Sequence, residues 1–260
     1  MHVVAVCGWQ EKTDDLIPLL AKALGITAYE ARQRMIGRPA VVACHADPHL
    51  ARDFAVNLSK AGISNRVVDA STVCGKGCPF IVRRFVLGAS SLHIEAGDGG
   101  SLTIPYEEIQ LLLPAMDIIG QAETKTVTER KLSLGKTLLS GGIPMTTKVS
   151  HQEEVRSEER RKLLYLFAGD MRPVVFSQDG MTYDGLGPAM KPSRELNFAF
   201  LLSELRDRGV NSSWDERLLT RLGQIKLLGP AQNAGNPLDL CAAVLAACLL
   251  PQGRDRSDTE

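Results

Sequence analysis

The stretch GITAYEARQRM, Gly25 to Met35, decides how the first seventy residues are expected to fold. Gly25 predicts the end of one helix, because glycine takes up helix-terminating conformations at little cost. Thr27 and Glu30 have the spacing of a capping box, in which the hydroxyl accepts from an unpaired amide and the carboxylate reaches back to the cap. The stretch therefore predicts two consecutive helices that meet at Gly25.

Apolar runs on either side of these helices predict three strands. A third helix is expected between the second and third strands, because Asp47 offers a capping carboxylate and Pro48 already has the helical φ. The order is then β-α-α-β-α-β, a module of the α+β class over residues 1–73. The three runs are residues 3–9, 40–44 and 66–69.

This module resembles the C-terminal domain of the bacterial ribosomal stalk protein, whose fold the Clp protease adaptor shares. The resemblance covers residues 3–69 and rests on Gly25, Glu30-Ala31-Arg32 and Ala61-Gly62. Both families bind other proteins and catalyse nothing, so the resemblance implies a protein-binding module.

The resemblance departs from the stalk family on the first helix. Where that family carries a lysine and an arginine that meet translation factors, this chain has Pro18 and Ala21. Arg32 matches the lysine of the family's second helix, which makes Arg32 a candidate partner-binding residue. The resemblance thus implies protein binding without implying recruitment of ribosomal factors.

From Phe80 onward, apolar residues recur at every second position, which predicts strands up to about residue 183. Pro192-Ser193 then caps an amphipathic helix that ends at Gly209. Antiparallel strands followed by one helix resemble a pleckstrin-homology-like barrel, whose C-terminal helix closes one end. Residues 80–209 are therefore predicted to form a second, barrel-like α+β domain, although any α+β sheet with a covering helix gives the same pattern.

Residues 120–160 interrupt the strand pattern with a polar segment rich in Thr, Ser and charge. A loop of this length is usually functional or disordered. We expect a mobile insertion that docks on a partner through its leucines, with Leu134, Leu138 and Leu139 as candidate binding residues. Residues 210–260 are expected to form a helical extension with a disordered tail.

The stretch CGKGC, Cys74 to Cys78, lies in the predicted linker, residues 74–79. A structural zinc site needs about four ligands, and the nearest further candidates are Cys44 and His45. Zinc at Cys44, His45, Cys74 and Cys78 is one alternative, and a thiol redox pair is another. The favoured interpretation is a hinge in which two small residues flank glycines.

Composition limits the function further. Lys plus Arg equals Asp plus Glu at 30 each, so no overall positive field attracts nucleic acid. The apolar run at residues 238–250 is shorter than the roughly 20 residues that a membrane span needs. The N-terminus has no signal-peptide pattern, so we expect a cytoplasmic protein. In that compartment all six cysteines should be reduced. Cys241 and Cys248 lie in the apolar run and are expected to act as small apolar residues.

Motifs for catalysis are weak in this sequence. LSLGKTLL lacks the first glycine of a phosphate-binding loop, because Arg130 stands in that place. His93 alternates with Leu92 and Ile94, which is typical of a surface strand residue. We therefore predict a non-enzymatic protein without a cofactor that binds another protein. The alternative is a metal- or thiol-dependent regulator or enzyme centred on Cys44, Cys74 and Cys78.

Overall fold

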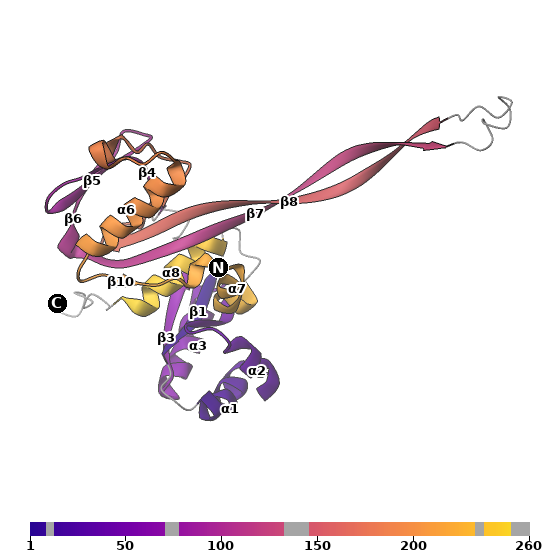
Figure 1. Ribbon diagram of the computed structural model, residues 1–260. Helices are drawn as coiled ribbons and strands as arrows, with labels where there is room; N and C mark the ends of the chain where they lie inside the picture. The colour runs from indigo at the N-terminus through magenta and orange to yellow at the C-terminus, as the bar shows by residue number, and fades with distance from the viewer. Residues whose placement is uncertain (9–12, 71–77, 133–145, 232–236, 251–260) are drawn as a thin grey trace. The chain divides into compact units, whose positions relative to one another are not determined.

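The computed structural model describes residues 1–8, 13–70, 78–132, 146–231 and 237–250 (Figure 1). Contacts divide the chain into two units. The compact unit combines Met1–Met116 with Arg161–Glu260, and the ribbon unit is Asp117–Arg160. Helices and strands both contribute, and the strands form two sheets, which confirms the expected α+β class.

The first sheet has three antiparallel strands in the order β2-β1-β3. Strand β1 is central, so Val3 lies opposite Cys44 on one side and Val68 on the other. The bounds are β1 (His2–Gly8), β2 (Ala40–His45) and β3 (Ser64–Asp69).

Three helices pack on one face of this sheet, and the expected order β-α-α-β-α-β is confirmed. The capping box is also present, because Glu30 N donates to Thr27 Oγ1 at 3.2 Å and Thr27 N donates to Glu30 Oε2 at 2.9 Å. Asp47 caps the third helix by accepting from His49 N at 2.7 Å. The helices are α1 (Thr13–Leu24), α2 (Ala28–Arg34) and α3 (Pro48–Lys60).

The second sheet has seven strands in the order β10-β7-β8-β9-β4-β5-β6. Most neighbours are antiparallel, whereas β9 pairs with β4 and β10 with β7 in parallel. The described strands are β4 (Phe80–Leu87), β5 (Ser91–Ala96), β6 (Ser101–Pro105), β7 (Ile109–Leu132), β8 (Thr146–Ala168), β9 (Val174–Ser177) and β10 (Ser213–Trp214).

This sheet is open, because its order begins at β10 and ends at β6. The expected barrel is therefore not closed. The expected covering helix is present as α6 (Arg194–Arg208), which buries Phe198, Leu201 and Leu205 in the core beneath the sheet. Ser193 caps this helix by accepting from Leu196 N at 3.2 Å.

The C-terminal part adds α7 (Arg221–Leu228) and α8 (Pro237–Leu249), with short 3-10 turns at Arg217–Leu219 before α7 and at Gly229–Ala231 after it. Further 3-10 turns among the described residues are Tyr106–Glu108 and Asp184–Ala189. Helix α8 is the expected apolar helix, and Cys241 within it is fully buried. No helix among the described residues is long and apolar enough to cross a bilayer.

Helix α8 joins the two sheets through one shared core. That core contains Val3 and Val41 from the first sheet, Leu113 and Tyr165 from the second, and Leu245 from α8. The two sides of the predicted linker therefore pack together in one compact unit. Residues 74–77 of that linker, with the first cysteine of CGKGC, lie outside the described residues.

The segment expected to have no regular structure is mostly strand, which corrects the prediction. Residues 120–132 belong to β7 and residues 146–160 to β8, and the two strands lie side by side as a twisted ribbon (Figure 1). The β-branched residues at positions 124 and 126–128 suit a pleated strand even without an apolar face.

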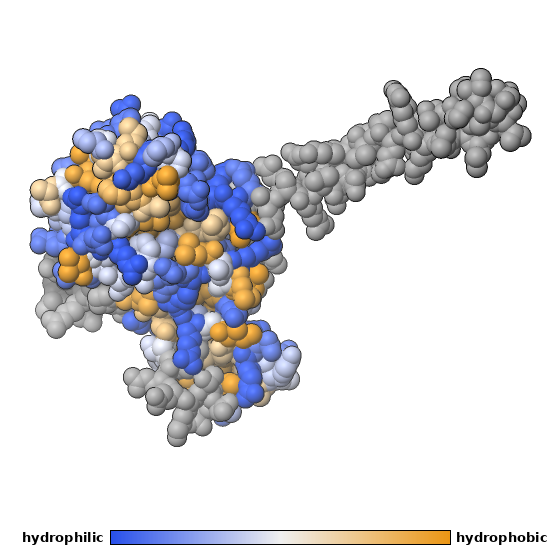
Figure 2. Space-filling view, viewed as in Figure 1, coloured by the Kyte–Doolittle hydropathy of each residue, from blue (hydrophilic) through white to orange (hydrophobic). Residues whose placement is uncertain are grey.

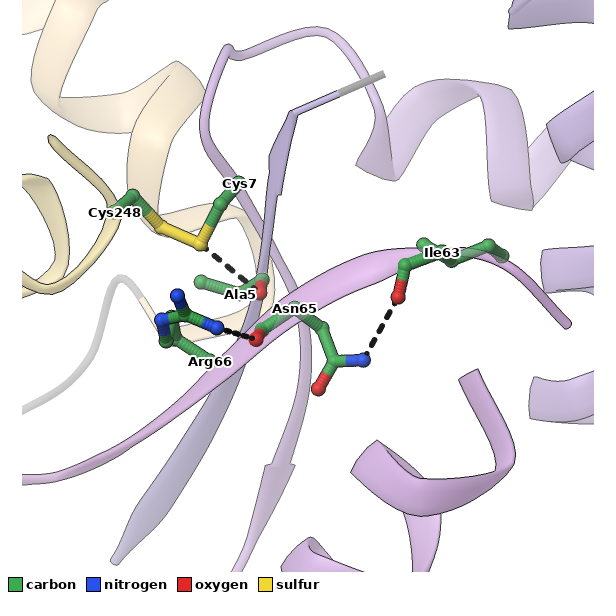
Figure 3. Close-up of a disulfide and its surroundings, with 6 residues drawn as sticks. All are labelled: Ala5, Cys7, Ile63, Asn65, Arg66 and Cys248. Atoms are coloured by element: carbon green, nitrogen blue, oxygen red, sulfur yellow. Dashed lines mark hydrogen bonds between the residues drawn. A yellow bond between two sulfur atoms is a disulfide. The ribbon is translucent and has the colours of Figure 1, made fainter. Parts of the chain in front are cut away.

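The expectation that all six cysteines are reduced is also wrong. Cys7 at the end of β1 forms a disulfide with Cys248 in the last turn of α8, and their Cα atoms are 5.0 Å apart (Figure 3). The Cys7 Sγ atom lies 3.8 Å from the carbonyl oxygen of Ala5. Cys248 thus links helix α8 covalently to strand β1, and it also packs against the apolar core.

Candidate functional site

The ribbon unit leaves long strand edges without a neighbour in the described chain. Strand β10 has two residues and pairs with β7 only at Leu111 and Leu112. Strand β9 has four residues and pairs with β8 only along Leu163–Leu166. Beyond these two short pairings, the sheet order gives β7 and β8 no neighbour in the described chain except each other. Residues 117–132 and 146–160 therefore have one paired edge and one outer edge each.

An outer strand edge is a specific chemical surface. Along an antiparallel strand, alternate N–H and C=O groups face the paired neighbour and the others face away. The groups that face away offer hydrogen bonds to any chain that lies beside them as a further strand. Proline would block such pairing, and the sequence has none within residues 117–132 or 146–160.

The ribbon sequence supplies little apolar surface of its own. Residues 120–131 and 146–158 are mainly threonine, serine, glutamine and charged residues. A two-stranded hairpin without a covering layer is only marginally stable in water. The ribbon would therefore gain order and stability from a partner that pairs with it.

The ribbon has no dominant charge. Within residues 117–160 the sequence holds seven acidic and seven basic residues, so opposite charges are matched and a polyanion gains no general attraction. The acidic residues are at 117, 123, 129, 153, 154, 158 and 159, and the basic ones at 125, 130, 131, 136, 148, 156 and 160.

The structure does not gather the predicted partner-binding residues into one place. Arg32 is an exposed residue of α2 in the compact unit. Leu134, Leu138 and Leu139 belong to residues 133–145, which lie outside the described residues. The structure thus describes the strands that lead to these leucines, and the leucines themselves stay a sequence prediction.

The predicted zinc ligands are not brought together in the described part of the chain. Cys44 and His45 end strand β2, Cys78 is exposed before β4, and Cys74 is not described. No group of three or more His, Cys, Asp or Glu residues among the described ones is arranged to hold a metal. The His45 ring packs at 5.8 Å from the Phe54 ring of α3.

The thiol of Cys44 is in an environment that disfavours its reactive form. Burial raises the pKa of Cys44, and the nearby Arg34 only partly opposes this effect. Metal ligation and nucleophilic attack both require the thiolate. The surroundings of Cys44 therefore do not supply the activation that the thiol-dependent alternative needs.

Exposed apolar residues of the compact unit are spread over many elements. The visible face in Figure 2 shows hydrophobic residues interspersed with hydrophilic ones. Single exposed apolar residues are ordinary on protein surfaces. Examples are Tyr29 on α2, Leu50 on α3, Leu196 on α6 and Leu222 on α7. These four residues lie on four different helices.

A pocket on the second sheet was not predicted from the sequence. Its volume is about 320 Å³, and eight residues line it: Arg84, Phe85, Val86, His93, Glu95, Thr182, Asp184 and Gly185. His93 is an exposed residue of β5, as expected for a surface strand position. The pocket was missed because its wall at residues 182–185 follows its floor on β4 and β5 by almost ninety positions.

Comparison with protein-family models, with curated proteins and with solved structures found no match to this chain. The resemblances to the stalk domain and to the pleckstrin-homology-like barrel therefore stay predictions from the sequence. The ribbon and the pocket have to be interpreted from their own geometry.

Proposed function

We propose that this protein is a non-enzymatic binding module that recruits another protein through the ribbon of β7 and β8. The observation that carries the proposal is the pair of outer strand edges along residues 117–132 and 146–160, which have no neighbouring strand in the described chain. Such edges bind extended peptide segments through main-chain hydrogen bonds.

A protein partner fits this surface better than other classes of partner. Main-chain pairing requires a second polypeptide, and the balanced charges of the ribbon give no advantage to nucleic acid. The proposal also includes the cytoplasmic location that we expect from the sequence, and it then requires the Cys7–Cys248 disulfide to persist in a reducing compartment. The leucines at positions 134, 138 and 139, which lie outside the described residues, remain candidate partner contacts from the sequence.

The test compares the full chain with a variant whose ribbon is shortened. Residues 120–158 are replaced by an Asn-Gly turn, which keeps the positions of β7 and β8 that pair with β10 and β9. Both proteins are used to capture partners from the native cell extract, with quantification by mass spectrometry. A partner retained by the full chain and lost by the variant is expected.

Amide hydrogen exchange then locates the contact in the purified complex. The partner should slow exchange within residues 117–132 or 146–160, because unpaired amides become hydrogen bonded. A second variant, in which Leu134, Leu138 and Leu139 are replaced by serine, keeps the strands and should weaken capture. If the shortened protein melts normally and still retains the partner, with protection confined to the compact unit, the proposal is wrong.

A further inference from the structure

The pocket on the second sheet has a floor of strand residues and a wall of one loop. Arg84 and Val86 of β4, with His93 and Glu95 of β5, line it from the sheet's outer side, while Phe85 beneath is buried. Its volume of about 320 Å³ lies at the lower end of the range of small-molecule sites. An amino acid or a dipeptide has a suitable size.

The wall of the pocket is fixed against strand β4. Thr182 N donates to the carbonyl oxygen of Arg83 at 3.0 Å. A Cβ atom on Gly185 would lie 1.7 Å from the carbonyl oxygen of Phe85, so only glycine permits this close approach. The Tyr183 ring stands edge-on to the Phe85 ring at 6.2 Å. The pocket is therefore built into the fold, without an ordering step on binding.

Three charged groups in the pocket have no ionic or hydrogen-bond partner within the described chain. Arg84 and Glu95 lie directly opposite each other on neighbouring strands, but no ion pair joins them within the described residues. Asp184 adds a second carboxylate from the wall. Arg84, Glu95 and Asp184 together have a net charge of −1 in one small pocket.

The imidazole of His93, which also lines the pocket, is oriented by two neighbouring hydroxyl groups. Its Nδ1 lies 2.8 Å from Thr103 Oγ1, and its Nε2 lies 3.3 Å from Ser91 Oγ. Val86 is its cross-strand neighbour. The pocket thus combines one cation, two carboxylates, an oriented imidazole and an apolar side chain.

We infer that this pocket binds a basic α-amino acid, free or within a dipeptide. The ligand carboxylate would pair with Arg84, and its cationic groups would pair with Glu95 and Asp184. A simple anion would meet two carboxylates, and a simple cation would leave Arg84 unpaired. A ligand with one carboxylate and two cationic groups has a net charge of +1 and complements the pocket.

The test is a titration of the full-length protein by isothermal calorimetry, supported by amide shifts in NMR spectra. The probes are L-lysine and L-arginine, each compared with its decarboxylated analogue, cadaverine and agmatine. Loss of one charge-assisted hydrogen bond costs roughly tenfold in affinity or more. We therefore expect the amino acids to bind at least tenfold more tightly than the analogues.

Variants assign the binding to this pocket. Arg84→Gln should remove the preference for the amino acid over its decarboxylated analogue, and Glu95→Gln should weaken both probes. Arg52→Gln, at an exposed position of α3, is the matched control and should change nothing. The inference is overturned if neither amino acid binds at millimolar concentration, if the analogues bind equally well, or if Arg84→Gln leaves the preference intact. The comparison of probes on the unaltered protein stays decisive even if a variant fails to fold.

Discussion

Cys7 and Cys248 are joined although 241 positions separate them in the sequence. The bond ties the end of a central strand to the last turn of the helix that covers the same strand. Leu245 of that helix shares a core with Val3 and Ala5 of β1. The covalent link therefore reinforces the contact that holds the first sheet and the C-terminal helix together.

Reduction of this disulfide should destabilise the compact unit. In the loop-entropy model, closing a loop of this length removes enough freedom from the unfolded chain to contribute about 5 kcal/mol. Urea unfolding with and without dithiothreitol should show this loss in the unaltered protein. The double variant Cys7→Ser/Cys248→Ser should show none. Equal midpoints for oxidised and reduced protein would contradict the prediction.

Replacement of Asn197 by leucine should also destabilise the fold. Asn197 is only 4% exposed; its Oδ1 accepts from Lys191 N at 2.5 Å and its Nδ2 donates to Lys191 O at 3.0 Å. Leucine leaves both backbone groups of Lys191 without this partner, at a cost of about 3 kcal/mol. Chemical unfolding measures the loss, with Asn211→Leu at an exposed position as the control. A loss of unfolding free energy smaller than that of the control would show that water takes over the hydrogen bonds of the Asn197 side chain.

Stability should fall at alkaline pH through Tyr183. Burial, with the nearby Asp179 carboxylate, raises the pKa of Tyr183 to about 12. Between pH 10 and 12 the unfolded tyrosine loses its proton while the folded one keeps it, so the free energy of unfolding falls by up to about 1.4 kcal/mol per pH unit. Below pH 10 the tyrosine keeps its proton in both states, so its full contribution to the free energy of unfolding is present.

The variant Tyr183→Phe isolates this effect. It loses the hydrogen bond to Gln178 O at 2.8 Å, so at pH 8 it should be less stable than the unaltered protein by about 1 kcal/mol. The difference should shrink when unfolding is repeated at pH 11. Tyr29→Phe, at a side chain that is 72% exposed, should leave the pH dependence unchanged. A difference independent of pH would refute the assignment.

The cysteines of CGKGC should be dispensable for folding. Serine matches cysteine in size, so Cys74→Ser/Cys78→Ser should melt within a few degrees of the unaltered protein. A structural zinc site would behave differently, because its binding energy of roughly 10 kcal/mol or more is folding energy. Elemental analysis of chelator-free protein completes the test. Zinc in the unaltered protein and a lost melting transition in the variant would favour the metal-dependent alternative.

Local signals predicted local structure well. The capping box at Thr27 and Glu30 and the Asp47 cap depend on side chains within four positions of each other. Such contacts form wherever the spacing is right. The order of helices and strands in the first seventy residues followed from them.

The ribbon could not be predicted in the same way. Its strands are polar, and the usual evidence for a strand is an alternating apolar face packed on a core. Threonine at positions 124, 126 and 128 was the remaining signal, and threonine is also frequent in loops. Charge and glycine near residues 141 and 142 then favoured the interpretation of a long loop.

Contacts between distant segments could not be predicted from the sequence. Val3, Ala5 and Val41 indicate a buried face of the first sheet, but they do not say what covers it. Helix α8 was predicted as apolar, and its place over β1 follows only from the fold. The pocket depends in the same way on Gly185 meeting Phe85, two residues from separate elements.

The order of the second sheet has a consequence for synthesis of the chain on the ribosome. Strand β9 lies between β8 and β4, so the edge of β4 that pairs with Val174 and Val175 stays open until those residues emerge. The face of β1 that holds Val3 stays uncovered for longer, until the residues around Leu245 have been synthesised. A nascent chain that stalls at the ribbon therefore presents both an open strand edge and an uncovered apolar face, which are the surfaces that chaperones hold and that aggregates grow from.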